Sequence, residues 1–380
     1  MRIAFLVERP TQFEAPFYRH AARQGGGELV VLFTDPEPAA PALDPELGRA
    51  VDWGIDLLGG YPQAVLPRRG RAGWLREHLA AGGYDLLVTN GYTRRVYLLG
   101  AALARRAGVA TGLRLDSVLW GESGARRRAK RLLLSGLLAR AYDLFFGVGS
   151  RTLEYLRAHG VPPERTALFP YAVDVEHFRE RSRRAAAERR AVRERLGVPL
   201  GARVVLSLAK FSSREAPWDL VRALSHPPCD GVTLVLAGDG PQRGELERAA
   251  AELAPGRVRF PGYVPYPELP ALYAAADLFV HPAREERWGV SVQEALACGL
   301  PVVASSRVGA AHDLVLPGRN GALYAAGDAE ELARRLGEAL ALPPAAVRAA
   351  SDGVLARWDY AATWRGLLAA AERVAARRAA

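Results

Sequence analysis

Residues 279 to 305 read FVHPAREERWGVSVQEALACGLPVVAS, and this stretch decides the fold of the surrounding chain. It opens with an apolar run, which the proline, charges and glycine of residues 282–289 cannot continue. The capping-box pattern of Ser291 to Glu294 predicts that a helix begins there, and Gly299 predicts its end. A second apolar run follows at residues 302–304. The stretch therefore predicts strand, loop, helix and strand in succession.

The start of this helix is a candidate anion site. Unpaired amide N–H groups and the helix dipole favour anions at a helix N-terminus, and Gly289 lets one approach the backbone closely. Two acids stand nearby, Glu286 in the loop and Glu294 in the first turn, with seven residues between them. Because a carboxylate repels phosphate, we expect these acids to accept hydrogen bonds from hydroxyls. A ligand with both phosphate and vicinal hydroxyls, such as a sugar nucleotide, fits the pattern.

A second interpretation of the two acids is equally open on spacing alone. Glu294 stands where a capping box places glutamate, so its carboxylate would bond the amide of Ser291. Glu286 would then be a solvated loop charge.

The rest of the chain alternates short apolar runs with segments of helical spacing. Continuous apolar strands between helices predict parallel sheets covered on both faces. The expected strands are residues 3–7, 29–33, 86–89, 111–115, 144–148, 204–208, 232–237 and 258–263. At 380 residues, with 49% hydrophobic and 24% charged residues, the chain suits two soluble α/β domains.

The opening stretch resembles a known signature. Glu286 followed by Trp288 and Gly289, with the run from Glu294 to Ser305, is similar to the donor site of retaining glycosyltransferases of family 4. The resemblance implies the α/β GT-B fold, in which two doubly wound, Rossmann-like parallel-sheet domains face an interdomain cleft. It implies an acceptor-binding domain (residues 1–180), a nucleotide-sugar-binding domain (181–355) and a helix that crosses back onto the first domain (356–380).

A departure from the family pattern follows the strand that ends at Leu208. The resemblance implies a basic residue there and a lysine five positions later, both facing the donor diphosphate. Lys210 fills the first place, whereas Glu215 stands at the second with the wrong charge. We expect Glu215 to point away and Arg214 to replace the lysine, because a guanidinium fork suits phosphate. An offset register or a reduced activity is the alternative.

The resemblance, together with the positions of loops that follow predicted strands, suggests roles for residues. The expected catalytic residues are Lys210, Arg214, Glu286 and Asp116. The expected donor-binding residues are Gly238, Asp239, Gly240, Tyr263, Trp288, Gly289, Val290, Ser291 and Glu294. The expected acceptor-binding residues are Gln12, Phe13 and Tyr92. Many relatives carry a glycine pair near the donor phosphates in the loop of residues 8–16, which has no glycine here. For Asp116, a turn or helix cap is an equally open interpretation.

The net charge of +10 indicates anionic partners. No nucleic-acid motif accompanies it, so a phosphorylated substrate or an anionic membrane is favoured. Residues 126–131 are basic and precede the leucines of residues 132–138, a pattern that can seat a helix on a bilayer. Core leucines behind a solvated helix end are the alternative. We expect a cytoplasmic protein, because residues 1–8 resemble a strand rather than a signal peptide. We also expect a monomer or weak dimer.

Neither metal nor disulfide is expected from the sequence. Cys229 and Cys298 lie far apart without Cys-x-x-Cys spacing, and no Asp-x-Asp pair is present. The expected function is metal-independent, retaining transfer of a hexose from a UDP- or GDP-type sugar to a glycan, lipid-linked or small-molecule acceptor. An epimerase or phosphorylase on the same fold is the nearer alternative. A non-catalytic sugar-nucleotide binder is another, and Glu215 motivates it.

Overall fold

The chain separates into two compact units. The computed structural model describes residues 1–44, 47, 49–199 and 201–379. Unit 1 comprises Met1–Ala40, Asp56–Val173 and the segment from Trp358, and unit 2 comprises Pro41–Ile55 and Asp174–Arg357. The sequence placed the boundary near residue 180 and kept residues 41–55 in the first domain. These residues instead group with unit 2, where Asp44 forms an ion pair with Lys210. A pattern of apolar residues cannot predict such a contact between charged side chains.

Unit 1 is built on a seven-stranded parallel sheet, in the order β5-β2-β1-β6-β7-β8-β9. The strands are β1 (Arg2–Val7), β2 (Glu28–Phe33), β5 (Gln63–Val65), β6 (Leu86–Asn90), β7 (Ala110–Leu115), β8 (Leu144–Gly147) and β9 (Thr166–Leu168). The helical segments are α1 (Glu14–Arg23), α2 (Arg71–Ala81), α3 (Arg95–Arg106), α4 (Gly124–Arg131), the π-helix η1 (Leu132–Leu138), α5 (Ala139–Ala141), α6 (Ser150–Ala158), η2 (Pro163–Arg165) and α16 (Tyr360–Ala379).

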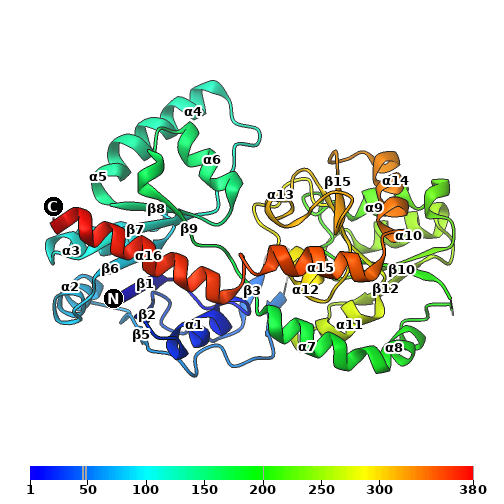
Figure 1. Ribbon diagram of the computed structural model, residues 1–380, viewed down its shortest axis with the longest axis horizontal. Coiled ribbons are helices and arrows are strands. Elements are labelled where there is room, and N and C mark those ends of the chain that lie inside the picture. The colour runs from blue at the N-terminus through cyan, green and yellow to red at the C-terminus, as the bar shows by residue number, and fades with distance from the viewer. Residues whose placement is uncertain (45–46, 48, 200, 380) are drawn as a thin grey trace. The chain divides into compact units, whose positions relative to one another are not determined.

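Helices cover both faces of this sheet. Alternate residues of β1 enter different cores: Phe5 packs with α1 and α16, whereas Leu6 packs with α2 and α3. This double burial explains why the strands are continuous apolar runs. The last helix, α16, lies beside α1 (Figure 1) and buries Trp364 and Leu367 in the core of β1 and β2.

Unit 2 contains a six-stranded parallel sheet, in the order β12-β11-β10-β13-β14-β15. The strands are β10 (Arg203–Leu208), β11 (Val232–Ala237), β12 (Val258–Gly262), β13 (Leu278–His281), β14 (Val302–Ser305) and β15 (Gly321–Tyr324), and a separate hairpin pairs β3 (Ala42–Asp44) with β4 (Arg49–Val51). The helical segments are α7 (Val175–Ala185), η3 (Ala186–Glu188), α8 (Arg189–Arg195), α9 (Pro217–Ala223), η4 (Pro227–Cys229), α10 (Arg243–Leu253), η5 (Tyr266–Glu268), α11 (Leu269–Ala275), α12 (Val290–Ala297), α13 (Ala311–Leu314), α14 (Ala329–Leu340) and α15 (Pro344–Leu355).

The helices of unit 2 also lie on both faces of their sheet. Helices α9, α10 and α14 pack on one face, around Leu234, Val280 and Val303. On the other face, Tyr273 of α11 stacks edge-on against Phe279 of β13, and α12 contacts β13 and β14. The predicted doubly wound architecture is therefore confirmed in each unit.

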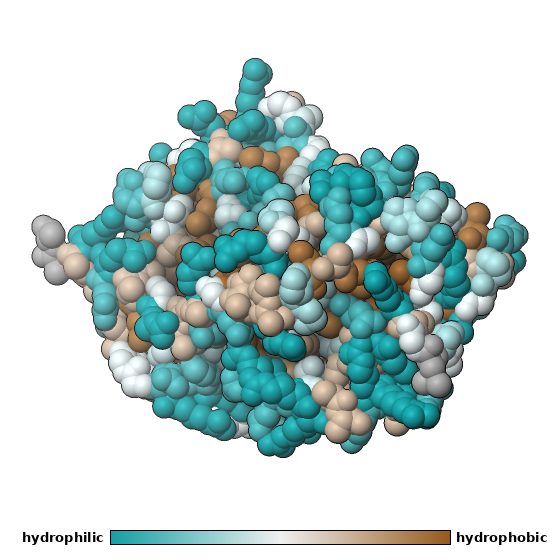
Figure 2. Space-filling view, turned by 45° about the vertical axis from the view of Figure 1, so that its right-hand side comes forward, coloured by the Kyte–Doolittle hydropathy of each residue, from teal (hydrophilic) through white to brown (hydrophobic). Residues whose placement is uncertain are grey.

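The leucines of residues 132–138 fit each of the two interpretations in part, since some are buried in the core and others are exposed. Leu134 and Leu138 are buried in unit 1, whereas the side chains of Leu132 and Leu137 are 76% and 64% exposed. Among the described residues, no helix combines the length and apolarity needed to cross a bilayer. On the face seen in Figure 2, hydrophilic residues dominate and apolar residues show in small areas between them.

Candidate active site

The candidate site lies at the carboxyl ends of β10, β11 and β13, the edge where open α/β sheets bind ligands. Two glycines of the loop after β11 allow it to approach the loop after β10. A Cβ on Gly238 would lie 1.8 Å from the carbonyl oxygen of Ala209, and one on Gly240 would lie 2.7 Å from the amide nitrogen of Phe211. This contact brings Asp239 beside the segment that carries Lys210, and the Phe211 amide donates to the Asp239 carbonyl at 2.9 Å.

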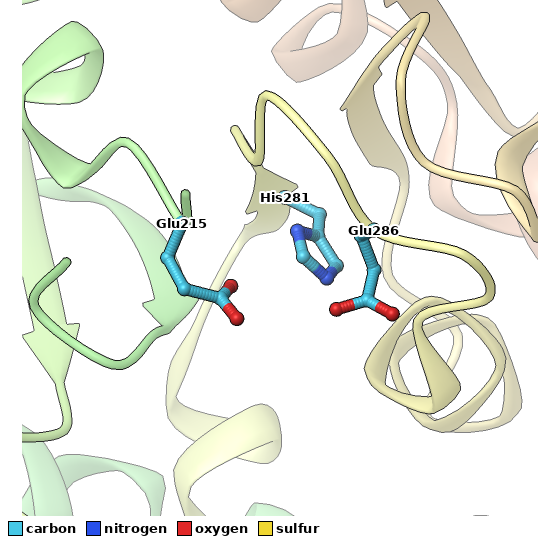
Figure 3. A group of neighbouring side chains, drawn as sticks. All are labelled: Glu215, His281 and Glu286. Carbon is cyan, nitrogen blue, oxygen red and sulfur yellow. The ribbon is translucent and has the colours of Figure 1, made fainter. Parts of the chain in front are cut away.

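Three side chains with metal- or proton-binding groups converge between these loops (Figure 3). Glu215 and His281 are 6% and 4% exposed, and Glu286 is half-buried. One ligand-type atom of each lies within 4.8 Å of those of the other two. The expectation that Glu215 points away is therefore wrong. Its carboxylate faces Glu286 across the imidazole of His281.

Arg214 explains why a buried carboxylate is stable here. Its Nη2 donates to Oε1 of Glu215 at 2.7 Å, and its Nη1 donates to Oε2 of Glu286 at 3.2 Å and to the carbonyl of Glu285 at 3.1 Å. The guanidinium thus bridges two carboxylates, which offsets part of their desolvation. Burial lowers the pKa of His281; the Glu286 carboxylate opposes this shift and the Arg214 charge adds to it.

Lys210 also has an acidic partner. Its Nζ lies 2.8 Å from Oδ2 of Asp44, which ends β3 of the hairpin. The lysine side chain is 34% exposed, so its ammonium group keeps access to solvent. Lys210 and Arg214, the two cations expected to bind the donor phosphates, therefore each form ion pairs with carboxylates.

The loop before α12 depends on Gly289. This residue has φ of +93°, and an added Cβ would lie 3.1 Å from Val308 and 3.2 Å from His281. Helix α12 begins at Val290, directly after Gly289, so the amides of Val290 and Ser291 belong to its first turn. Trp288 is 2% exposed, and its backbone amide donates to Oε1 of Glu286 at 3.2 Å.

The predicted capping box at Ser291 is wrong. The N-cap residue of α12 is Gly289, which has no side chain to cap the helix, and the carboxylate of Glu294 accepts a hydrogen bond at 2.8 Å from the hydroxyl of Tyr273 in α11. Glu294 is 3% exposed, and burial raises its pKa to about 7, although the Tyr273 hydrogen bond opposes the shift. Its carboxylate therefore lies against α11, apart from the cluster of Glu215, His281 and Glu286.

The remaining expected residues lie around these elements or in unit 1. Tyr263 follows β12 and is half-buried. Asp116 and Gln12 are half-buried in loops that follow β7 and β1. The ring of Phe13 packs against Tyr171 with centroids 5.4 Å apart. Tyr92 is half-buried, and burial raises the pKa of its hydroxyl.

A hollow of about 400 Å³ opens on unit 1. The residues that line it do not include the four site residues expected in this unit, Gln12, Phe13, Tyr92 and Asp116. It is lined by Glu8, Thr34, Asp35, Pro36, Arg71, Arg94, Arg95 and Val96. These residues follow β1 and β2 or begin α2 and α3, so the hollow lies at the carboxyl edge of the sheet. Its three arginines suit an anionic ligand.

Sequence reasoning missed three other features. His281 is a polar residue at the end of an apolar strand, a position that is itself a signal. Asp44 carries no local signal. Arg114 and Glu14 form a buried ion pair at 2.7 Å, and Arg114 also donates to the carbonyls of Phe169 and Pro170 at 2.9 and 2.8 Å.

Comparison with known proteins places this geometry in a family. Residues 188–353 match the glycosyl transferases group 1, and residues 17–172 match the glycosyl transferase 4-like domain. D-inositol 3-phosphate glycosyltransferase 1 of Catenulispora acidiphila is 34% identical over 358 residues, which cover 87% of this chain and 82% of that protein. The chain belongs to the group 1 glycosyltransferases.

A second relative and a solved structure agree with this family assignment. The GDP-mannose-dependent alpha-(1-6)-phosphatidylinositol monomannoside mannosyltransferase of Mycolicibacterium smegmatis is 35% identical over 299 residues, covering 75% of this chain and 74% of that one. The crystal structure of Anabaena HepE in complex with UDP superimposes with a TM-score of 0.73 at 21% identity, covering 97% of this chain and 98% of HepE. The predicted GT-B fold and transferase class are therefore confirmed.

Proposed function

We propose that this glycosyltransferase moves a hexose from a UDP- or GDP-type nucleotide sugar to a hydroxyl acceptor with retention of configuration. The observation that carries the proposal is the link from Arg214 to Glu286, whose carboxylate also accepts a hydrogen bond from the Trp288 amide just before α12, with Lys210 on the same loop as Arg214. Support for the donor comes from HepE, whose structure contains UDP, and from the M. smegmatis relative, which is named as GDP-mannose-dependent.

The charges of the site suit departure of a nucleoside diphosphate. Negative charge develops on the leaving phosphate, and Lys210, Arg214 and the amides of the first turn of α12 would stabilise it. Donors aimed at a developing oxyanion contribute about 10²- to 10³-fold each. Glu286, fixed by the amide of Trp288, would accept hydrogen bonds from sugar hydroxyls. The leaving phosphate would take the proton of the acceptor, and Glu294 and Asp239 would contact the nucleoside.

For the acceptor, we propose a phosphorylated polyol that binds in the hollow of unit 1. Arg71, Arg94 and Arg95 line that hollow and would pair with the phosphate, while Glu8 and Asp35 would accept hydrogen bonds from hydroxyls. Two relatives support this class, since they are named for inositol 3-phosphate and for phosphatidylinositol monomannoside.

A peripheral membrane contact from the cytoplasmic side forms the last part of the proposal. The exposed side chains of Leu132 and Leu137 follow the exposed arginines 126–128 of α4. Apolar side chains beside cations bind an anionic bilayer surface. Co-sedimentation with vesicles that contain anionic lipid should exceed that with neutral vesicles. A double substitution of Leu132 and Leu137 by Ser should abolish the difference; equal sedimentation with both vesicle types contradicts this part.

The transfer itself is tested by screening UDP- and GDP-hexoses with inositol 3-phosphate and measuring nucleoside diphosphate release. The expected result is release that requires the acceptor, with NMR showing that the product keeps the donor's anomeric configuration. Conversion of the donor without an acceptor would indicate an epimerase. Binding without release would indicate a non-catalytic binder, and an inverted product would reject retention.

A further inference from the structure

The backbone directly after Glu215 is strained. The next residue, Ala216, has φ of +51° and ψ of +43°, and its amide donates to the Ser212 carbonyl at 3.1 Å. A left-handed alanine is costly, and such strain persists where the surrounding contacts impose it, most often at functional sites. The Glu215 side chain that precedes this turn is 6% exposed. Its inward position is therefore a defined part of the loop after β10.

The buried Glu215 carboxylate holds a more exposed partner in place. The Arg214 side chain is 38% exposed, and its Nη2 donates to Oε1 of Glu215 at 2.7 Å. An exposed arginine samples many rotamers, and holding it in one of them costs conformational entropy. A charge-assisted hydrogen bond to a fixed carboxylate offsets that cost. Glu215 is thus the anchored member of the pair, and it sets the direction of the guanidinium.

Arg214, held in this way, links the two loops of the candidate site. Its Nη1 donates to the carbonyl of Glu285 at 3.1 Å and to Oε2 of Glu286 at 3.2 Å. Its own backbone carbonyl accepts a hydrogen bond of 2.8 Å from the amide of Arg284. Arg214 therefore contacts the loop after β13 through both its backbone and its side chain. A change in the direction of its guanidinium would alter both loops.

Glu215 also affects how Glu286 is paired. A guanidinium that faced one carboxylate alone would favour a bidentate pair with both of its oxygens. In the structure, Arg214 donates to Oε2 of Glu286, while Oε1 accepts a hydrogen bond from the Trp288 amide. The second edge of the guanidinium faces Glu215 instead. Sharing Arg214 in this way weakens its hold on Glu286, the carboxylate expected to accept hydrogen bonds from sugar hydroxyls.

We propose that Glu215 is a positioning residue for sugar transfer, which holds Arg214 in place to stabilise the leaving diphosphate. This inference rests on the proposed function and deepens it, because it gives a role to a residue whose charge is wrong for contact with phosphate. The lysine that the family resemblance implies at this position is then replaced by two residues, since Arg214 supplies the charge and Glu215 its direction. Restoring a lysine at position 215 should therefore impair the site, although it adds a cation.

The test is a double-mutant cycle on the full chain, measured as kcat and donor KM. Glu215→Gln should lower kcat about tenfold or more, because it misplaces a group that acts on the leaving phosphate. Donor KM should change less than about threefold, since Arg214 acts on charge that develops during departure. In an Arg214→Ala background, Glu215→Gln should change kcat less than about twofold, because its effect passes through Arg214. Glu215→Asp, which keeps the charge, should retain more of kcat than Glu215→Gln.

Glu285→Gln is the matched control, since it removes an exposed neighbouring carboxylate and keeps the backbone carbonyl that Arg214 contacts; it should leave kcat unchanged. The inference is overturned if Glu215→Gln keeps the original kcat, if Glu215→Lys raises kcat, or if the losses from Glu215→Gln and Arg214→Ala multiply in the double variant.

If Glu215→Gln does not fold, the comparison of Arg214→Ala with the double variant decides, because the double variant removes both charges of the pair. Equal kcat supports the inference, and a further loss rejects it. A chain that releases no nucleoside diphosphate with any donor rejects the proposed function and this inference with it. A chain that transfers sugar but shows independent effects of the two substitutions rejects this inference alone.

Discussion

The hydroxyl of Tyr273 donates a hydrogen bond of 2.8 Å to the carboxylate of Glu294, which is 3% exposed. The pair joins α11 to α12, the helix whose N-terminus forms part of the candidate site. Burial is the main reason that the pKa of Glu294 rises from 4.5 to about 7.

This shift predicts a pH dependence of stability. Below pH 4.5, Glu294 is protonated in the folded and unfolded states alike, so burying its carboxyl group costs no ionisation energy. As the pH rises toward 7, the Glu294 carboxyl ionises in the unfolded state but stays protonated in the folded state. The free energy of unfolding therefore falls by about 3 kcal/mol in total. Above pH 7 the loss is constant. Urea unfolding of the chain and of Glu294→Gln, from pH 4 to 8, should show a difference that changes only between these limits. A constant difference contradicts the prediction.

Gly289→Ala should impair both stability and donor binding. The backbone at φ of +93° disfavours a side chain, and the new methyl group would press on Val308 and His281. We expect a loss of about 1 to 3 kcal/mol in unfolding free energy and a raised KM for the donor. Gly353→Ala is the control, because Gly353 lies in α15 with open space around it. That change should stabilise the chain by up to about 1 kcal/mol. Equal effects of the two substitutions would contradict the argument.

Ala216→Gly should stabilise unit 2. Ala216 is the non-glycine residue with positive φ among the described residues, at +51°, and it precedes α9. Glycine removes the strain of the left-handed conformation at some cost in backbone entropy, with a net gain of about 1 kcal/mol. The same substitution at Ala349, exposed within α15, should instead destabilise by about 1 kcal/mol. Chemical unfolding monitored by fluorescence distinguishes the signs.

Lys210→Met should reduce turnover about 10²- to 10³-fold, since it removes a cation expected to stabilise the leaving diphosphate. The substitution should lower kcat more than it lowers the unfolding free energy. The ion pair between Lys210 and Asp44 is partly exposed, so its loss should cost little stability. Arg222→Met, on the exposed side of α9, is the control for loss of a positive charge. Turnover above one tenth of the original rate in Lys210→Met would remove this residue from the proposed machinery.

Glu14→Ala should destabilise unit 1 by about 3 to 5 kcal/mol, because it leaves the charge of Arg114 buried without its carboxylate. The Arg114 side chain is 2% exposed and cannot reach solvent without disturbing Phe169 and Tyr171, whose rings lie 4.3 and 4.2 Å from its guanidinium carbon. Combining Glu14→Ala with Arg114→Met should recover part of the loss. A double variant less stable than the sum of the two single changes would contradict this explanation.

The sequence predicted the elements of the fold better than the contacts of the site. Strands such as Val232–Ala237 are recognisable because burial on both faces leaves an uninterrupted apolar run. The loop of residues 282–289 followed from its proline, charges and glycine, whereas the left-handed conformation of Gly289 came only from the structure. Contacts between distant segments could not be predicted in this way. Spacing placed Glu294 in a capping box, but the hydroxyl of Tyr273, from another helix, is its partner.

Glu215 shows the same limit. Its unfavourable charge beside an expected phosphate site suggested an outward orientation, and that inference considered only the ligand. The neighbouring Arg214 supplies two hydrogen-bond donors to the cluster, which changes the balance in favour of burial. Asp44 escaped notice because its partner, Lys210, lies far along the chain.

The position of α16 has a consequence for synthesis. The strands and first helix of unit 1 leave the ribosome early, but Trp364 and Leu367 complete the core between α1 and the sheet. Unit 2 needs no residue beyond Arg357. During translation all residues of unit 2 are therefore made before α16, so unit 2 can fold while unit 1 still exposes the apolar residues that α16 later covers.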